Sequence, residues 1–327
     1  MTEPIVSVRH AVKTFQASKG GLGGKKKFVH AVNDVSFDIQ PGETFSLVGE
    51  SGCGKSTTGR LIDHLISPDS GEIWFCGKDI SHIPEKEMRP LRADVQMIFQ
   101  DPYGSLNPRI KIQDQLGEPL LLHTNLSQGE RLKKVQELLR TVGLSASHGE
   151  RYPHEFSGGQ LQRIGIARAI SVNPKLMIAD EPVSALDVSI QAQVLTLMKK
   201  LQSQLNLTYL FISHDLSVVE MISDRIAVMY LGAIVELADK RDLYARPIHP
   251  YTQALLSAVP EPDPTIKKDR ILLEGDIPSP VNPPSGCLFH TRCAYCTERC
   301  RQEVPEARDF GNGHMVKCHL AEKFAGK

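Results

Sequence analysis

A glycine-rich run near residue 50 has the residue types and spacing of a phosphate-binding loop. It follows an apolar stretch at 44–48, precedes a predicted helix at 57–65, and reads Gly49-Glu50-Ser51-Gly52-Cys53-Gly54-Lys55-Ser56-Thr57. Its glycines let backbone N–H groups approach phosphate oxygens, and the N-terminus of the helix adds partial positive charge. Lys55 would reach the β- and γ-phosphates, and Ser56 would ligate Mg²⁺. The loop therefore predicts a site for a nucleoside triphosphate.

Two adjacent carboxylates, Asp180 and Glu181, end a hydrophobic strand predicted at 176–179. Asp180 could hold Mg²⁺ through its water shell, and Glu181 could orient or deprotonate an attacking water. Without other motifs, two acidic residues at the junction between a strand and a loop would be an ordinary feature with no indication of function. Beside a phosphate-binding loop, the pair favours hydrolysis of the nucleotide.

A second anion site is predicted where a helix begins at about residue 158. The segment Phe156-Ser157-Gly158-Gly159-Gln160 precedes a helix-forming stretch at 161–169. Ser-Gly-Gly at a helix start leaves backbone N–H groups free for an anion. A capped helix after a turn would explain the serine and glycines, but it would not explain the order of these motifs along the chain.

Charge and hydropathy limit the classes of protein that this sequence could belong to. The 327 residues carry 38 basic and 38 acidic side chains, so net charge gives no indication of DNA, RNA or an anionic membrane as partner. No stretch approaches the roughly 18 uninterrupted apolar residues of a membrane-spanning helix, and the N-terminus lacks the features of a signal peptide. We expect a cytosolic protein, held at any membrane by other subunits.

The elements expected around these motifs are those of an α/β fold. Alternating patterns at 5–12 and 32–40, with a strand at 72–76, predict an antiparallel flank. Buried strands at 95–99, 176–179, 209–212 and 226–229, separated by helical patterns such as 190–205, predict a parallel sheet covered on both faces. Strand signals stop between 101 and 152, where Ser127 and Glu130 form a capping box, so a helical insert is expected. Residues 18–27 and the proline-rich 260–286 are expected to be loops or linkers.

With these motifs in this order, residues 5 to about 240 resemble an ABC-type ATPase. The resemblance implies a RecA-like parallel sheet core with an antiparallel β flank, an ATPase domain at 1–240 and a helical subdomain at about 101–164. It also implies ATP and Mg²⁺ as cofactors. In that family, Ser157-Gly158-Gly159-Gln160 of one subunit would close over the γ-phosphate held by the phosphate loop of a second, so two ATP molecules would be sandwiched in a dimer.

The resemblance extends to four single residues. Phe15 is similar to the aromatic that stacks on adenine, although a core aromatic is the alternative, since 18–27 interrupt the usual spacing to the next strand. Gln100 is similar to the sensing glutamine, with a contact to Mg²⁺ or water. Asp187 resembles the aspartate that acts across the dimer, and His214 resembles the switch histidine that contacts the γ-phosphate. Membrane subunits are expected to dock near Gln100.

Two further stretches resemble the dipeptide/oligopeptide importer branch: 101–109, and 246–256 with Pro278-Ser279-Pro280 downstream. The resemblance implies an ATP-hydrolysing subunit at the cytoplasmic face of the bacterial inner membrane. Its partners would be a paralogous or identical ATPase, two transmembrane permeases and a periplasmic or lipid-anchored substrate-binding protein, with no nucleic acid. A nickel or glutathione importer is the alternative. A soluble ABC-type ATPase acting on ribosomes or DNA is disfavoured, because the chain has neither two ATPase units nor long coiled coils.

The C-terminal extension, 241–327, is rich in cysteine. Cys287, Cys293, Cys300 and Cys318 occupy the four usual positions of the same branch, and four thiolates at such spacing suit a [4Fe–4S] cluster. Cys296 departs from that pattern and makes a tetrathiolate Zn²⁺ site the alternative, with His290, His314 and His319 nearby. Unligated surface thiols are the third interpretation. In each metal-bound case the metal would act as a structural clasp for the tail.

Overall fold

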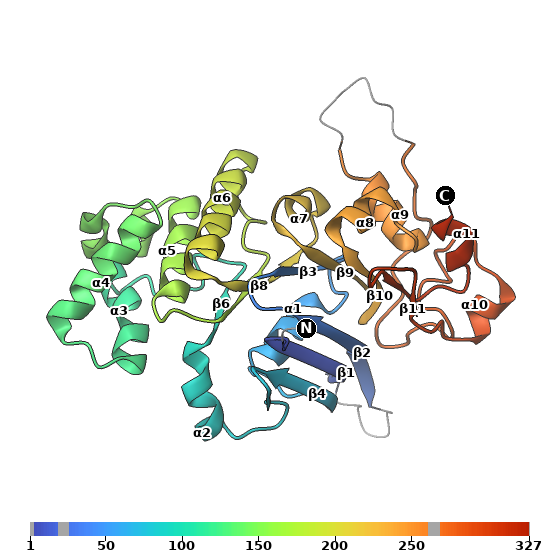
Figure 1. Ribbon diagram of the computed structural model, residues 1–327, viewed down its shortest axis with the longest axis horizontal. Helices are drawn as coiled ribbons and strands as arrows, with labels where there is room; N and C mark the ends of the chain where they lie inside the picture. The colour runs from blue at the N-terminus through green and yellow to red at the C-terminus, as the bar shows by residue number, and fades with distance from the viewer. Residues whose placement is uncertain (1–2, 19–25, 261–268, 327) are drawn as a thin grey trace.

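Two sheets and three groups of helices make up the fold of the computed structural model, which describes residues 3–18, 26–260 and 269–326. The loop expected at 18–27 and the linker expected at 260–286 fall partly at 19–25 and 261–268, outside the described residues. The helical insert and the C-terminal extension lie at opposite ends of the long axis, with the sheets between them (Figure 1).

The larger sheet carries the predicted parallel strands. Its described strands run in the order β11-β12-β10-β9-β3-β8-β7-β6, and pairing is parallel from β9 to β6 and antiparallel from β11 to β9. The strands are β3 (Thr44–Val48), β6 (Val95–Ile98), β7 (Leu176–Asp180), β8 (Thr208–Ser213), β9 (Arg225–Tyr230), β10 (Ala233–Asp239), β11 (Arg308–Asp309) and β12 (Met315–Val316).

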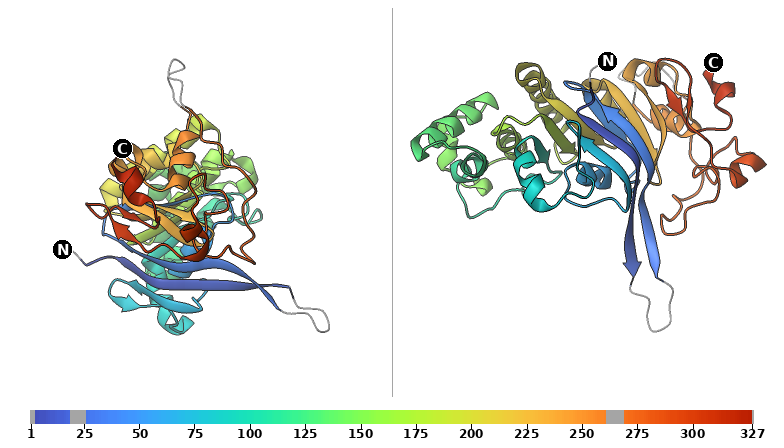
Figure 2. Two further views of the ribbon diagram at one scale, coloured as in Figure 1. Left: turned by 90° about the vertical axis from the view of Figure 1, so that its right-hand side faces the viewer. Right: turned by 60° about the horizontal axis from the view of Figure 1, so that its bottom comes forward.

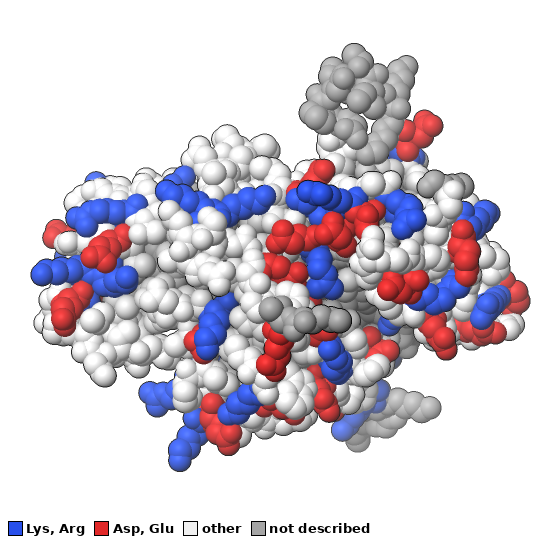
Figure 3. All heavy atoms as spheres, in the orientation of Figure 1, with Lys and Arg blue, Asp and Glu red and all other residues white. Residues whose placement is uncertain are grey.

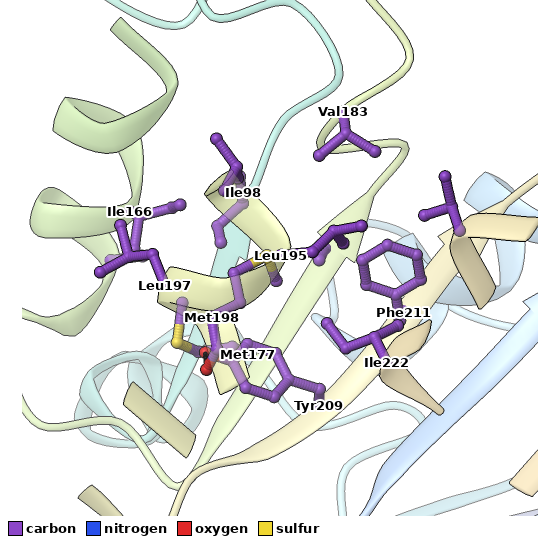
Figure 4. Packing of buried hydrophobic residues seen from close by; sticks show 14 of the residues in the cluster. Ile98, Ile166, Met177, Val183, Leu195, Leu197, Met198, Tyr209, Phe211 and Ile222 are labelled. Atoms are coloured by element: carbon purple, nitrogen blue, oxygen red, sulfur yellow. Dashed lines mark hydrogen bonds between the residues drawn. The ribbon is translucent and has the colours of Figure 1, made fainter. Parts of the chain in front are cut away.

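Burial on both faces explains why these strands read as unbroken apolar runs. Along β8, Tyr209 and Phe211 belong to the hydrophobic cluster on one face, while Leu210 and Ile212 belong to the cluster on the other. Figure 4 shows Tyr209 and Phe211 packed with Met198 and other residues of the first cluster. A parallel strand covered on both sides needs an apolar residue at every position.

The smaller sheet is the predicted antiparallel flank. Its described strands run in the order β2-β1-β4-β5, all antiparallel, with β1 (Val6–Ser18), β2 (Lys27–Ile39), β4 (Ser70–Phe75) and β5 (Lys78–Asp79). Strands β1 and β2 are longer than the patterns at 5–12 and 32–40 predicted, and together they project from the body of the molecule (Figure 2). Register shifts along the β1–β2 pair explain why the apolar alternation fades there.

The insert between β6 and β7 is helical, as predicted. Ser127 and Glu130 form the predicted capping box: the Glu130 N–H donates to Ser127 Oγ, and the Ser127 N–H donates to the Glu130 carboxylate at 2.8 Å. The described helices of this part are α3 (Ile112–His123), α4 (Gln128–Thr141) and α5 (Gly158–Ile170), with 3-10 turns η2 (Ala146–Glu150) and η3 (Pro153–Glu155).

The remaining helices pack beside the two sheets or in the extension. They are α1 (Lys55–Ile62), α2 (Glu85–Met88), η1 (Arg89–Ala93), α6 (Val188–Leu205), α7 (Leu216–Ile222), α8 (Lys240–Ala245), α9 (Pro250–Ser257), α10 (Glu298–Gln302) and α11 (Ala321–Ala325). On the face shown in Figure 3, basic and acidic side chains are interspersed. Within the described ranges, no helix combines the length and the hydropathy needed to cross a bilayer.

The C-terminal extension adds strands β11 and β12 to the edge of the core sheet. Strand β12 pairs with β10, and the fully buried Glu236 of β10 ties two later segments to the sheet. Its carboxylate accepts hydrogen bonds from the Ile248 and His249 N–H groups and lies 2.7 Å from Nε2 of the buried His314. A buried carboxylate needs such partners, so Glu236 fixes both segments.

Burial of His249 makes stability depend on pH. Its Nδ1 caps α9 by accepting a hydrogen bond from the Tyr251 N–H at 3.1 Å, and burial lowers the pKa of His249 from 6.5 to about 4, against the opposing effect of Glu236. Below pH 6.5 the unfolded chain therefore binds a proton that the folded chain refuses, and stability falls as the pH drops towards 4, by about 3 kcal/mol from this group.

Replacing His249 with asparagine, which also caps helices, should remove this contribution. We expect denaturant unfolding at pH 7, 5.5 and 4.5 to give a flatter pH dependence for His249→Asn than for the wild type, whereas the exposed His82→Asn should follow the wild type. Equal slopes for His249→Asn and the wild type would contradict the account.

Candidate functional site

A pocket of about 790 Å³ opens where the phosphate loop meets the carboxyl ends of β3, β6, β7 and β8. Ligands of parallel sheets bind at this edge, since loops that follow neighbouring strands converge there. Eleven of the predicted site residues line it: Phe15, Gly49, Ser51, Gly52, Gly54, Lys55, Ser56, Thr57, Gln100, Glu181 and His214.

Two glycines are required by the shape of the phosphate loop. Gly54 has a φ of +105°, and a Cβ there would lie 2.1 Å from the Ala31 carbonyl oxygen. Gly49 has a φ of +148°, and its Cβ would lie 2.2 Å from the Met229 carbonyl oxygen. Both contacts are far shorter than van der Waals distance, so only glycine lets the loop sit this close to β2 and β9.

Lys55 is buried, and its ammonium group points towards the backbone of the phosphate loop. Lys55 Nζ donates to the carbonyl oxygens of Gly49 at 2.7 Å and Glu50 at 3.1 Å. Ser56 Oγ donates to Asp180 Oδ1 at 2.7 Å, and burial raises the pKa of the Asp180 carboxyl while this hydrogen bond opposes the shift. The sequence predicted that Ser56 and Asp180 would share one ion, and the fold places them in contact.

Glu181 is the centre of a three-residue contact. Gln100 Nε2 donates to Glu181 Oε2 at 3.0 Å, and His214 Nδ1 lies 3.1 Å from Glu181 Oε1. Glu181 has a φ of +46°, a left-handed conformation that costs a non-glycine residue about 1–3 kcal/mol. The three side chains come from residues just after β6, β7 and β8, so the sheet brings together residues far apart in sequence.

Phe15 lies at the mouth of the pocket and is not a core aromatic. Its side chain is 40% exposed, and Lys13 Nζ lies 5.7 Å from its ring centroid. Val29, Ala31 and Leu255 line the same pocket and were not predicted. No sequence pattern marked Val29 or Ala31, because both lie outside the strands predicted at 5–12 and 32–40. The pairing of β2 with β1 in the structure sets Val29 opposite Phe15.

The second predicted anion site lies apart from the pocket. None of Ser157, Gly158, Gly159, Gln160 and Asp187 lines it. The Ser157 N–H donates to Gln160 Oε1 at 3.0 Å at the start of α5. A Cβ on Gly158 would contact the Leu186 side chain, next to Asp187. These residues therefore form a second group in the chain, beside one another and outside the lining of the phosphate-loop pocket.

The tail cysteines are neighbours but do not form a recognisable metal site. Burial raises the pKa of Cys287 to about 12 and of Cys318 to about 11, and nearby thiols add to both shifts. Over residues 3–18, 26–260 and 269–326, no group of three or more His, Cys, Asp or Glu side chains is placed to hold a metal ion. The predicted [4Fe–4S] cluster on Cys287, Cys293, Cys300 and Cys318, and the Zn²⁺ alternative with Cys296, are thus not supported by the described geometry.

Comparison with known proteins assigns the chain to a family. The family model for "ABC transporter" matches residues 32–184, and that for "Oligopeptide/dipeptide transporter, C-terminal region" matches residues 235–300. The oligopeptide transport ATP-binding protein AppF of Bacillus subtilis is 54% identical over 321 residues, covering 97% of this chain and 98% of its own. The chain belongs to the oligopeptide/dipeptide branch of the ABC transporter ATP-binding proteins.

Other relatives agree with this assignment. The di/tripeptide transport ATP-binding protein DppF of Pseudomonas aeruginosa is 51% identical over 326 residues, covering 99% of this chain and 100% of its own. Among solved structures, the dimeric ATP-binding cassette MJ0796, bound to ADP and Pi in a post-hydrolysis state, has a TM-score of 0.65 and 28% identity and covers 72% of this chain and 99% of its own. The predicted ABC-type ATPase fold is thereby confirmed, and the chain is an ABC-type ATPase.

Proposed function

We propose that this chain is the ATP-hydrolysing subunit of a bacterial ABC importer for dipeptides or oligopeptides. The single observation that carries the proposal is the contact of Gln100 and His214 with Glu181 at the wall of the phosphate-loop pocket. It puts an acid that can serve as a base between two polar side chains, in the pocket that the phosphate loop lines.

In this proposal each residue of the pocket has a defined role. The backbone N–H groups of the phosphate loop and Lys55 bind the phosphates, and Phe15 stacks on adenine. Glu181 orients the attacking water and accepts its proton, and His214 contacts the γ-phosphate. Gln100 contacts the water or the metal ion, and its position between sheet and insert lets phosphate loss change their relative geometry.

The oxygen atoms of Ser56 and Asp180 beside the phosphate loop are suitable ligands for Mg²⁺. Ser56 Oγ and the Asp180 carboxylate already share a hydrogen bond of 2.7 Å, and hydroxyl and carboxylate oxygens are the ligands that a hard cation takes. Ser56, Asp180 and Gln100 would hold the ion, which supplies positive charge to the β- and γ-phosphates when bound.

We propose further that two ATPase subunits, identical or paralogous, share each nucleotide. The separation of Ser157, Gly158, Gly159, Gln160 and Asp187 from the pocket motivates this, since one chain carries both groups without joining them. The dimeric MJ0796 structure supports it by analogy of fold. The subunits would sit on the cytoplasmic face of the inner membrane beneath two permeases served by a substrate-binding protein, with residues 1–240 as ATPase domain and 241–327 as extension.

Copurification tests the transport assignment. We expect the chain, tagged and expressed in its own cells, to copurify with membrane permeases and an ATPase activity, and the associated binding protein to take up peptides in a ligand screen. Association with ribosomes or DNA in place of permeases would contradict the proposal. A binding protein selective for nickel or glutathione would contradict the peptide assignment alone.

A [4Fe–4S] cluster on Cys287, Cys293, Cys300 and Cys318 stays a prediction, with Zn²⁺ and Cys296 as the alternative. No step of the proposed hydrolysis passes through it, because the described geometry does not support a metal there. Visible absorption with iron, sulfide and zinc analysis of anaerobically purified protein decides among cluster, zinc and free thiols.

A further inference from the structure

An ion pair joins the cysteine-rich extension directly to the phosphate loop. Arg292 Nη1 and Nη2 donate to the two carboxylate oxygens of Glu50 at 2.7 and 3.2 Å. The Arg292 side chain is only 7% exposed, and these residues are 242 positions apart in sequence. A two-pronged contact of this kind fixes direction as well as distance.

The backbone of Glu50 makes two further hydrogen bonds. Its N–H donates to the Tyr251 hydroxyl at 3.0 Å, and its carbonyl oxygen accepts from Lys55 Nζ at 3.1 Å. Both Arg292 and Tyr251 belong to the extension, so two of these three contacts on the loop's second residue come from the C-terminal extension.

The extension presents Arg292 from a rigid base. The backbone N–H of Arg292 donates to the Phe289 carbonyl oxygen at 3.1 Å, and the Phe289 side chain is buried. The Phe289 ring packs against Tyr230 and Tyr251, with centroid distances of 5.3 and 5.4 Å. Tyr230 ends β9 of the core sheet, so the guanidinium is anchored to the sheet that carries the loop.

The charge of Glu50 makes this contact matter for nucleotide binding. Glu50 lines the pocket, within a loop whose other features favour negative phosphates. An unpaired carboxylate there would repel a bound triphosphate, because like charges interact strongly in a partly desolvated pocket. Arg292 removes that repulsion by pairing with the carboxylate, and it also holds the loop's first turn in place.

We propose that Arg292 is a positioning residue that acts through Glu50, so that the C-terminal extension sets the affinity of the phosphate loop for ATP. The inference rests on the proposed binding of ATP at this loop. It adds a task for the extension that requires no metal: neutralising and orienting one acidic residue of the ATP site.

The test is a charge-rescue series measured as ATP affinity by calorimetry in the presence of Mg²⁺, using the full chain. We expect Arg292→Gln to weaken ATP binding about tenfold, because it leaves the Glu50 carboxylate unpaired. Adding Glu50→Gln should recover most of the loss, and Arg292→Lys, which keeps the charge but gives up the two-pronged contact, should lose less affinity than Arg292→Gln. Arg308→Gln breaks another ion pair of the extension, with Glu322, and should bind ATP normally.

Glu50→Gln alone separates this proposal from a merely structural pair. It removes the repulsive charge, and the amide oxygen of glutamine can still accept a hydrogen bond from Arg292 and keep the loop in place, so ATP affinity should equal or exceed that of the wild type. This expectation holds even if Arg292→Gln does not fold. The proposal is overturned if folded Arg292→Gln binds ATP normally, if the double variant is as weak as Arg292→Gln, or if Glu50→Gln weakens binding. Failure of the wild type itself to bind ATP would instead refute the proposed function.

Discussion

Replacing Glu181 with glutamine should lower the rate of ATP hydrolysis by about 10²–10⁴-fold and leave ATP affinity almost unchanged. Glutamine has nearly the same shape and keeps an oxygen that can accept from Gln100 Nε2, so the contact at 3.0 Å survives. It cannot take a proton from water, so the chemical step loses its base. Because the shared nucleotide is then not cleaved, ATP should hold the two subunits together.

Three measurements check this prediction. Phosphate release gives the rate, calorimetry gives the affinity, and size-exclusion chromatography with ATP gives the fraction of dimer. Glu87→Gln is the matched control, since Glu87 lies on helix α2 as an exposed partner of Lys78, and this variant should behave as the wild type. Hydrolysis at the wild-type rate by Glu181→Gln would remove Glu181 from its assigned task.

Lys55→Ala should abolish measurable nucleotide binding, with a loss of about 100-fold or more in affinity. Hydrogen bonds from a charged donor contribute about 1.5–3 kcal/mol each, and a buried lysine can give two of them to the phosphates. In this structure Lys55 Nζ donates to the carbonyl oxygens of Gly49 and Glu50. When a nucleotide binds, we expect the ammonium group to donate to phosphate oxygens in place of these carbonyl oxygens.

A control lysine separates this effect from a general loss of charge. Lys175 forms an exposed ion pair with Asp94 at 2.9 Å, so Lys175→Ala should retain wild-type affinity. Thermal unfolding should show that Lys55→Ala is folded before its affinity is measured. Normal ATP affinity in folded Lys55→Ala would contradict the assignment of the phosphate loop.

The parts of the site that the sequence predicted are those governed by short-range rules. The phosphate loop needs only nine consecutive residues, and the Ser127–Glu130 capping box needs four. Gln100 and His214 were named by resemblance to the family, and their closeness to Glu181 follows from the rule that the ends of parallel strands meet at one edge of a sheet. The contacts of both side chains with Glu181 follow from it.

The contacts that the sequence did not predict depend on pairing across long distances. Arg292 and Glu50 are 242 residues apart, and neither stands in a pattern that names the other. The short strand β12 was also missed, because two residues, Met315 and Val316, show no periodicity. It forms by adding to the open edge of β10, which only the folded sheet provides.

We propose that one chain holds two incomplete halves of a nucleotide site, so ATPase activity per chain should depend on concentration as the purified protein is diluted. Sedimentation at the same concentrations gives the dimer fraction, with the paralogous partner included if the chain does not pair with itself. We predict that activity falls in proportion to the dimer fraction. Monomers that hydrolyse ATP as fast per chain as dimers would contradict the account.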